Sequence, residues 1–220
     1  MADSRKQQEE HAEQAAPRPG TARLTDPRAL RAYAHPTRMR LVGLLRMEGP
    51  FTATRAAELT GESVASCSYH LRMLAKYGLV ELAPGGQGRE KPWRATARFT
   101  DWPEYSEDPA VAEAGRAVEK VAAEQYFEQM RKAIEERPAL PREWQEATVF
   151  GDTLLYLTAD ELSSVGERLA EVLRPYERLQ EAREAHPEGA RLVQIIRTGF
   201  PVARPPASPP ASPPPGGGPR

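Results

Sequence analysis

Apolar residues recur at helical spacing through residues 64–76, and this segment predicts an amphipathic helix. The positions that share its apolar face, the last two at its edges, are Cys67, Leu71, Leu74, Val64 and His70. Ser63 precedes the helix as an N-cap, because its hydroxyl can accept a hydrogen bond from an otherwise unpaired backbone N–H. Gly78 ends the helix. One face is therefore expected in the core and the other at the surface.

The outward face of this helix carries small, hydroxyl-bearing and basic side chains and no acidic one. Its members are Ala65, Ser66, Ser68, Tyr69, Arg72 and Lys76. A short helix over residues 53–59 and a tight turn at Thr60-Gly61 come before it, and a strand over residues 79–82 follows. This order predicts a helix-turn-helix with a wing, in which the second helix reads DNA.

The wing is expected as a β-hairpin with a glycine-rich tip at residues 84–88 and a returning strand at residues 91–97. Three cations crowd this hairpin: Arg89, Lys91 and Arg94. Side chains of this kind contact phosphates. With Ser63 and the outward face of the helix, they make up the predicted DNA-binding set.

Helix start signals and composition divide the rest of the chain. Asp108-Pro109 starts a long helix with an Asp cap and a proline in its first turn, as Asp26-Pro27 does for an earlier one. Its apolar stripe is too long for a small winged domain to cover, so we expect dimer contacts there. The expected segments are a disordered tail (1–24), a winged helix-turn-helix domain (25–100), a long dimerisation helix (108–137), a C-terminal module (144–200) and a disordered proline-rich tail (201–220).

The C-terminal module is predicted as strand, helix, strand. Residues 147–157 indicate a strand pair or one long bulged strand, and residues 190–200 indicate another strand. Between them, Thr158 and Glu161 form a capping box for a helix that runs to about residue 185. The module is expected to serve dimerisation or effector binding, and the fold class is α+β, mainly helical.

Charge divides the chain near residue 100. Residues 28–100 carry 12 Lys or Arg and 5 Asp or Glu, a balance of +7, whereas residues 101–190 carry 10 and 21, a balance of −11. The basic part coincides with the winged helix, as expected for a head that binds a polyanion. No apolar run could span a bilayer, no secretory signal begins the chain, and one cysteine excludes an intramolecular disulfide. We therefore expect a cytoplasmic protein with no membrane partner.

Several runs of residues agree in order and spacing with a known family. They are His35-Pro36-Thr37-Arg38-Met39-Arg40-Leu41, Ala56-Ala57-Glu58-Leu59-Thr60, Ser68-Tyr69-His70-Leu71-Arg72-Met73-Leu74 and Tyr77-Gly78-Leu79-Val80. These runs resemble the winged-helix domain of ArsR-type (ArsR/SmtB-like) bacterial transcriptional regulators, over residues 26–98. The resemblance implies a dimeric repressor or activator, and many such proteins release DNA on binding a metal or another inducer.

The metal ligands of that family are missing here. Members that sense soft metals carry paired cysteines in the helix that corresponds to residues 53–59, where this chain reads Thr54-Arg55-Ala56-Ala57-Glu58. Others use His and Asp on a C-terminal helix, and residues 108–136 contain no His. We therefore expect neither a metal nor another cofactor.

Other candidate chemistry is sparse. Cys67 could act as a redox switch in the reading helix, but a small buried apolar group is favoured because Arg72 and Lys76 face away from it. No Ser-His-Asp order, phosphate loop or catalytic carboxylate pair predicts an enzyme. Four aromatic residues could line an effector pocket, although ordinary packing explains them equally well: Trp102, Tyr105, Trp144 and Tyr156.

The patterns together predict a homodimeric transcriptional regulator that binds a palindromic site in double-stranded DNA and responds to a small molecule. The alternative is a winged helix that docks onto another protein without reading DNA. The acid-free, basic face of the helix over residues 64–76 argues against this alternative.

Overall fold

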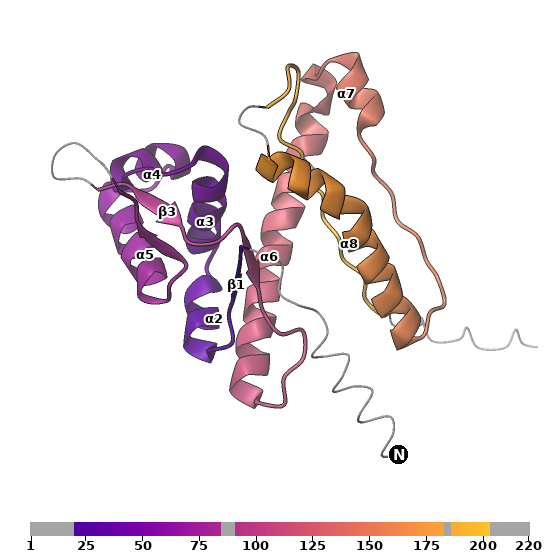
Figure 1. Ribbon diagram of the computed structural model, residues 1–220, viewed down its shortest axis with the longest axis horizontal. Helices are drawn as coiled ribbons and strands as arrows, with labels where there is room; N and C mark the ends of the chain where they lie inside the picture. The colour runs from indigo at the N-terminus through magenta and orange to yellow at the C-terminus, as the bar shows by residue number, and fades with distance from the viewer. Residues whose placement is uncertain (1–19, 85–90, 183–185, 203–220) are drawn as a thin grey trace, which may run out of the picture. The chain divides into compact units, whose positions relative to one another are not determined.

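The computed structural model describes residues 20–84, 91–182 and 186–202 (Figure 1). The chain divides into two units, Met1–Glu146 and Ala147–Arg220, and the described residues of each are compact. Most of both predicted tails, and Arg89 of the predicted wing, lie outside the described residues.

The first unit is mainly helical, with two small sheets. Its elements are β1 (Thr21–Arg23), α2 (Pro27–Tyr33), α3 (Pro36–Glu48), α4 (Ala53–Thr60), α5 (Val64–Lys76), β2 (Val80–Leu82), β3 (Trp93–Ala95), β4 (Phe99–Asp101), α6 (Pro109–Glu136), the 3-10 turn η1 (Arg137–Ala139) and α7 (Arg142–Ala147). The predicted α+β, mainly helical class with an N-terminal winged helix-turn-helix is confirmed.

The wing is a two-stranded antiparallel hairpin of β2 and β3, in which Val80 pairs with Ala95 and Leu82 with Trp93. Trp93 also makes an isolated bridge to Phe51, which leads into α4. The wing is therefore tied to the start of the helix-turn-helix as well as to the end of α5.

The second sheet corrects the predicted N-terminal boundary. Residues 1–24 were expected to be a tail, but β1 pairs in parallel with β4, with Thr21 opposite Phe99, and Leu24 is buried. A strand of three residues has little signal of its own. Its hydrogen bonds come from a partner far along the chain, which local sequence patterns do not reveal.

The core of the first unit joins the winged domain to the start of α6. Its largest fully buried side chains are Leu30, Leu41, Leu71, Leu74, Leu79, Val42, Val80, Val118 and Cys67. In the first half of α6, Ala114 and Val118 pack into this core, and α2 lies against the same helix. Further along α6, Phe127 and Ile134 are exposed. The long apolar stripe is therefore covered at one end and uncovered at the other.

The second unit contains the predicted helix but not the predicted strands. Helix α8 (Ala159–Ala182) starts with the expected capping box, because the N–H of Glu161 donates to Thr158 Oγ1 and the N–H of Thr158 donates to Glu161 Oε2. Residues 148–158 and 190–200 form no strand. A strand needs a neighbouring backbone for its hydrogen bonds, and the described part of this chain offers these segments none.

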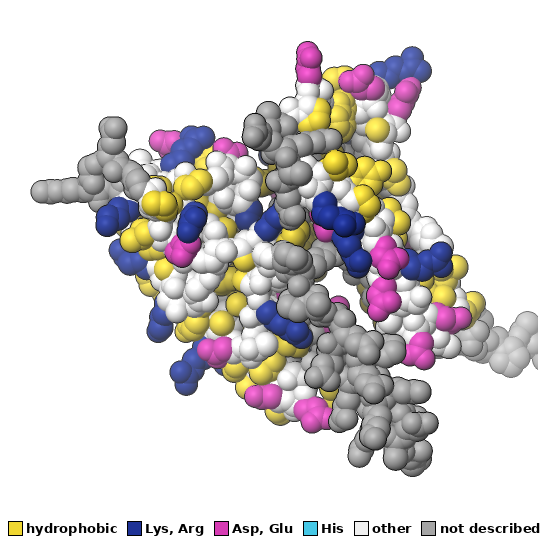
Figure 2. Space-filling view, viewed as in Figure 1, with side chains coloured by type: hydrophobic (Ala, Val, Ile, Leu, Met, Phe, Trp, Pro, Cys, Tyr) yellow, Lys and Arg dark blue, Asp and Glu magenta, His cyan; other side chains and the backbone are white. Residues whose placement is uncertain are grey.

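Many large apolar side chains of the second unit are exposed, and Figure 2 shows apolar patches on its surface. No helix in the described ranges is long and apolar enough to cross a membrane.

Candidate nucleic-acid interface

Local capping shapes the helix-turn-helix. Thr52 Oγ1 accepts a hydrogen bond from the N–H of Arg55 at 3.3 Å, which starts α4. Gly61 ends α4 at φ +78°, a conformation that favours glycine, and its N–H donates to the carbonyl of Ala57. Ser63 Oγ then accepts from the N–H of Ser66 at 3.1 Å, which confirms the predicted cap of α5. These contacts set the turn between the two helices.

Helix α5 buries the predicted face and presents the other. Cys67, Leu71 and Leu74 are fully buried and His70 is 8% exposed. On the opposite side Tyr69 is 52% exposed. The remaining predicted residues of this side are exposed (Ala65, Arg72, Lys76) or half-buried (Ser66, Ser68). Val64, expected at the edge of the apolar face, is 42% exposed because it lies in the first turn, beyond the core.

Hydrogen bonds within the protein already occupy part of this face. Ser66 Oγ donates to Glu62 Oε2 at 2.5 Å, and Thr37 Oγ1 donates to Glu62 Oε1 at 2.5 Å. These two bonds lower the pKa of the Glu62 carboxyl, that from Ser66 more than that from Thr37. Ser66 would therefore have to give up this bond before it could donate to a phosphate. Glu62 lies just before α5, so a count of the charges on the helix alone does not include it.

Arg72 is held in place on the same face. Its Nη1 donates to Ser68 Oγ at 3.1 Å, one helical turn earlier. The bond directs an exposed guanidinium along α5 and leaves its other donors available. Arg72 and Tyr69 thus present donors on the surface that the sequence predicts to meet DNA.

The described cations of the wing, Arg94 and Lys91, are at least half exposed, and Arg94 is paired with an acidic side chain. Arg94 Nη2 lies 2.6 Å from Glu81 Oε1 across the β2–β3 hairpin, and both side chains are about half exposed. Lys91 is exposed. A surface ion pair of this kind is worth little, so a phosphate could replace Glu81 at small cost.

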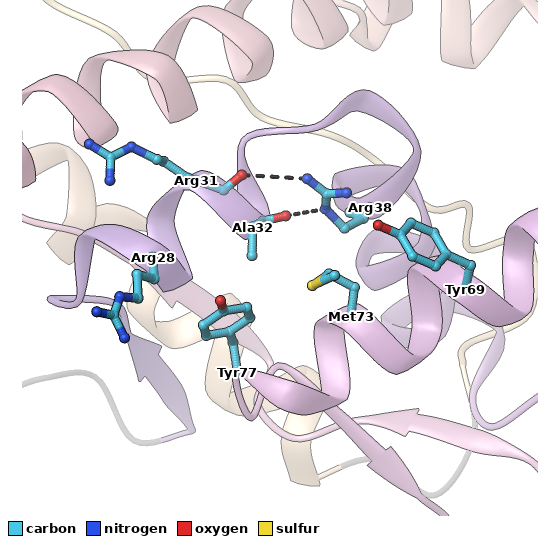
Figure 3. A pocket seen from close by; sticks show the side chains of 7 residues that line it. All are labelled: Arg28, Arg31, Ala32, Arg38, Tyr69, Met73 and Tyr77. Carbon is cyan, nitrogen blue, oxygen red and sulfur yellow. Dashed lines mark hydrogen bonds between the residues drawn. The ribbon is translucent and has the colours of Figure 1, made fainter.

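Sequence reasoning missed a group of arginines beside α5. A groove of about 340 Å³ is lined by Arg28, Arg31, Ala32, Arg38, Tyr69, Met73 and Tyr77 (Figure 3). The first three come from α2, Arg38 from the first turns of α3, and the others from α5 and its C-cap. Arg28 and Arg31 lie one turn apart in the sequence, which was the available signal, but only the packing of α2 beside α5 brings them to Tyr69.

The four aromatic residues predicted to line an effector pocket differ in burial, and three of them belong to the first unit and one to the second. Trp102 packs against Tyr33 with ring centroids 6.4 Å apart, so ordinary packing accounts for it. Tyr105 is 81% exposed and Tyr156, in the second unit, is 94% exposed. Trp144 is half-buried after η1. Effector binding by these residues stays a prediction.

Cys67 and the histidines of the described residues are not grouped as metal ligands. Cys67 is fully buried, with its Sγ 3.4 Å from Thr60 Oγ1, in accord with a small group that fills the core. Within the residues that the structure describes, no group of three His, Cys, Asp or Glu side chains is placed to hold a metal ion.

Comparison with known proteins agrees with this geometry. A family model described as a helix-turn-helix domain matches residues 33–83, from the end of α2 through β2. The chain carries a helix-turn-helix domain. This match and the wing accord with the resemblance to ArsR-type regulators, and they support a DNA-binding transcriptional regulator.

Among solved structures, the chain is similar to the transcriptional repressor BigR from Xylella fastidiosa. The two sequences are 22% identical, the alignment covers 56% of this chain and 94% of that chain, and the TM-score is 0.28. A superposition this loose adds nothing to the functional argument. No curated protein matches the chain.

Proposed function

We propose that this protein binds a specific double-stranded DNA sequence as a homodimer and regulates transcription. The single observation that carries the proposal is the outward face of α5, where Tyr69 and Arg72 are exposed on a helix whose other face is fully anchored. Such a helix can enter a major groove, and two of them in a dimer would meet successive grooves about 34 Å apart.

Neighbouring elements would supply the sequence-independent contacts. Lys76 at the end of α5 and the wing cations Lys91 and Arg94 carry positive charge beside this face. Ser63, Ala65, Ser66 and Ser68 complete the proposed contact set on α5, and Arg89 is its remaining wing member. Phosphate contacts fix the position of a protein on DNA, while base contacts select the sequence.

The dimer is proposed from α6. Its Phe127, Met130 and Ile134 lie on one side of the helix and are all exposed. A second copy of the chain would bury this part of the stripe against its own, so that each protomer presents one α5 to a palindromic site. The proposal also includes a small-molecule response through the second unit, which offers apolar surface at Val149, Phe150 and Tyr156.

The test starts from duplexes selected out of a random pool by the full chain. On the selected duplex, Tyr69→Ala and Arg72→Ala should each cost about 1–3 kcal/mol of binding free energy, and much less on random duplexes, because they remove base contacts. Titrations monitored by fluorescence anisotropy measure both.

Tyr176→Ala and Arg174→Ala serve as matched controls, because both side chains are exposed on α8 of the second unit. They should bind like the unaltered chain. Equal losses on selected and random DNA for the two α5 variants would contradict base reading. A chain that binds no duplex at all would favour the protein-docking alternative.

A further inference from the structure

The groove beside α5 has the composition of an oxyanion site. Its seven lining residues include three arginines and two tyrosines and no acidic residue. Ala32 and Met73 add a small apolar wall. The sequence-based DNA-binding set included only one of these residues, Tyr69.

Arg38 is fixed at this groove by the end of the neighbouring helix. Its Nε donates to the carbonyl of Ala32, and its Nη2 lies 3.4 Å from the carbonyl of Arg31 (Figure 3). Both carbonyls belong to the last turn of α2, where backbone acceptors lack partners within the helix. The bonds restrict the rotamers of Arg38, so less entropy is lost when its other donors bind a ligand.

Arg28 and Arg31 add charge that is available to a ligand. Both side chains are exposed. Arg31 Nη2 makes a long contact of 3.5 Å to Glu113 Oε2. No partner for the Arg28 guanidinium is found among the described residues.

Tyr69 connects this groove to the surface that would read bases. The same side chain lines the groove and projects from the outward face of α5, and Figure 3 shows its hydroxyl directed toward Arg38. A duplex whose bases contact Tyr69 would carry a backbone phosphate within reach of this groove. Arginine and tyrosine donors are among the side chains that hold DNA phosphates.

We propose that the part of the groove lined by Arg28, Arg31, Arg38 and Tyr77, next to Tyr69, holds a backbone phosphate of the bound DNA beside the reading face of α5. This inference rests on the proposed function. It adds a phosphate contact from α2 and α3, two helices outside the helix-turn-helix pair and the wing.

The test is the salt dependence of binding to the selected duplex. Each phosphate contact that is lost should reduce the slope of log Kobs against log salt concentration by about 0.9. The proposed dimer loses one contact in each protomer, so Arg28→Gln should lower the slope by about two units. It should weaken selected and random DNA by the same factor. Gln keeps helix propensity, and the N–H of residue 28 still reaches the Asp26 cap.

Arg174→Gln is the matched control, because it removes the same charge from an exposed arginine of α8. Its slope should equal that of the unaltered chain. A second measurement locates the contact: neutral methylphosphonates are placed along the duplex in symmetric pairs, one at the same position of each half-site. At the phosphate that occupies the groove, Arg28→Gln should cause no further loss of affinity.

The outcomes separate the two proposals. If the unaltered chain binds no duplex, the proposed function fails and this inference falls with it. A second outcome overturns only the groove assignment. In it, the unaltered chain binds DNA and the Tyr69 and Arg72 variants lose specificity, but Arg28→Gln and Arg174→Gln have the same slope of log Kobs against log salt concentration.

Inorganic phosphate tests whether the groove binds a free phosphate group instead of a DNA phosphate. If phosphate at constant ionic strength raises the Tm, and Arg28→Gln abolishes this rise but leaves the DNA slope unchanged, the groove serves a free phosphorylated ligand instead.

Discussion

Two histidines meet at the buried face of α5. His35 and His70 have ring centroids 4.7 Å apart, and His70 Nε2 lies 4.0 Å from Glu62 Oε2. The Nδ1 atom of each is buried without a described hydrogen-bond partner. Burial lowers the pKa of both, Arg38 adds to the effect, and His70 lowers the pKa of His35 further, while Glu62 acts in the opposite direction on both. Neutral rings are therefore the form that the fold favours.

This pair predicts a loss of stability in mild acid. A histidine whose pKa is lower in the folded than in the unfolded chain contributes stability above the unfolded value of about 6.5. That contribution is lost as pH falls, because the unfolded chain takes up protons first. The free energy of unfolding, measured by urea titration at pH 7.5 and 5.5, should fall with pH, and His70→Gln should reduce the fall. His186→Gln, at an exposed site of the second unit, should leave the fall unchanged; an identical effect of both variants would contradict a role for the buried pair.

Among the helices, α5 has the buried face and the N-cap that its sequence predicted. Its spacing predicted which side chains anchor it, and Leu71 and Leu74 are fully buried as expected. Its cap was also predictable, because Ser63 acts on an N–H three residues away. Both features depend on residues within one helix.

The anchoring predicts unequal costs along α5. Leu71→Ala should lower the free energy of unfolding by about 2–5 kcal/mol, because it leaves a cavity in the core. Val64→Ala removes less buried surface from the same helix and should change the stability by at most about 0.5 kcal/mol. Urea unfolding followed by circular dichroism compares the two. Similar losses for both would show that the exposed first turn is covered by a partner in solution.

The strands predicted in the second unit are absent from its described residues, and the reason also lies at the scale of single elements. Residues 147–157 have the β-branched and aromatic composition of a strand. Composition of this kind suits a pleated, half-buried surface, but it does not supply a neighbouring strand. Without one in the described chain, Val149 and Tyr156 stay exposed outside any sheet.

At the scale of the whole molecule, the exposed apolar side chains of α6 lead us to expect a dimer. Phe127 is 67% exposed in the uncovered half of the stripe. Phe127→Glu should place a charge in the proposed dimer contact and produce monomers, as measured by sedimentation velocity. Monomers should bind the palindromic duplex more weakly, because each offers one α5 instead of two.

Gln129→Glu provides the control for that variant. It adds the same charge to an exposed polar position on the other side of α6. It should leave the sedimentation coefficient unchanged. A monomeric unaltered chain, or dimers that persist with Phe127→Glu, would contradict the α6 contact.

Residue spacing alone was enough for the helix-turn-helix, the wing strands and the cap of α5, because helical periodicity and capping act over a few neighbouring residues. Tertiary structure decided the rest. The pairing of β1 with β4, the division of α6 into a covered and an uncovered half, and the placement of Arg28, Arg31 and Arg38 beside Tyr69 all join residues far apart in the chain. Such contacts depend on how whole elements pack, and no local pattern carries that information.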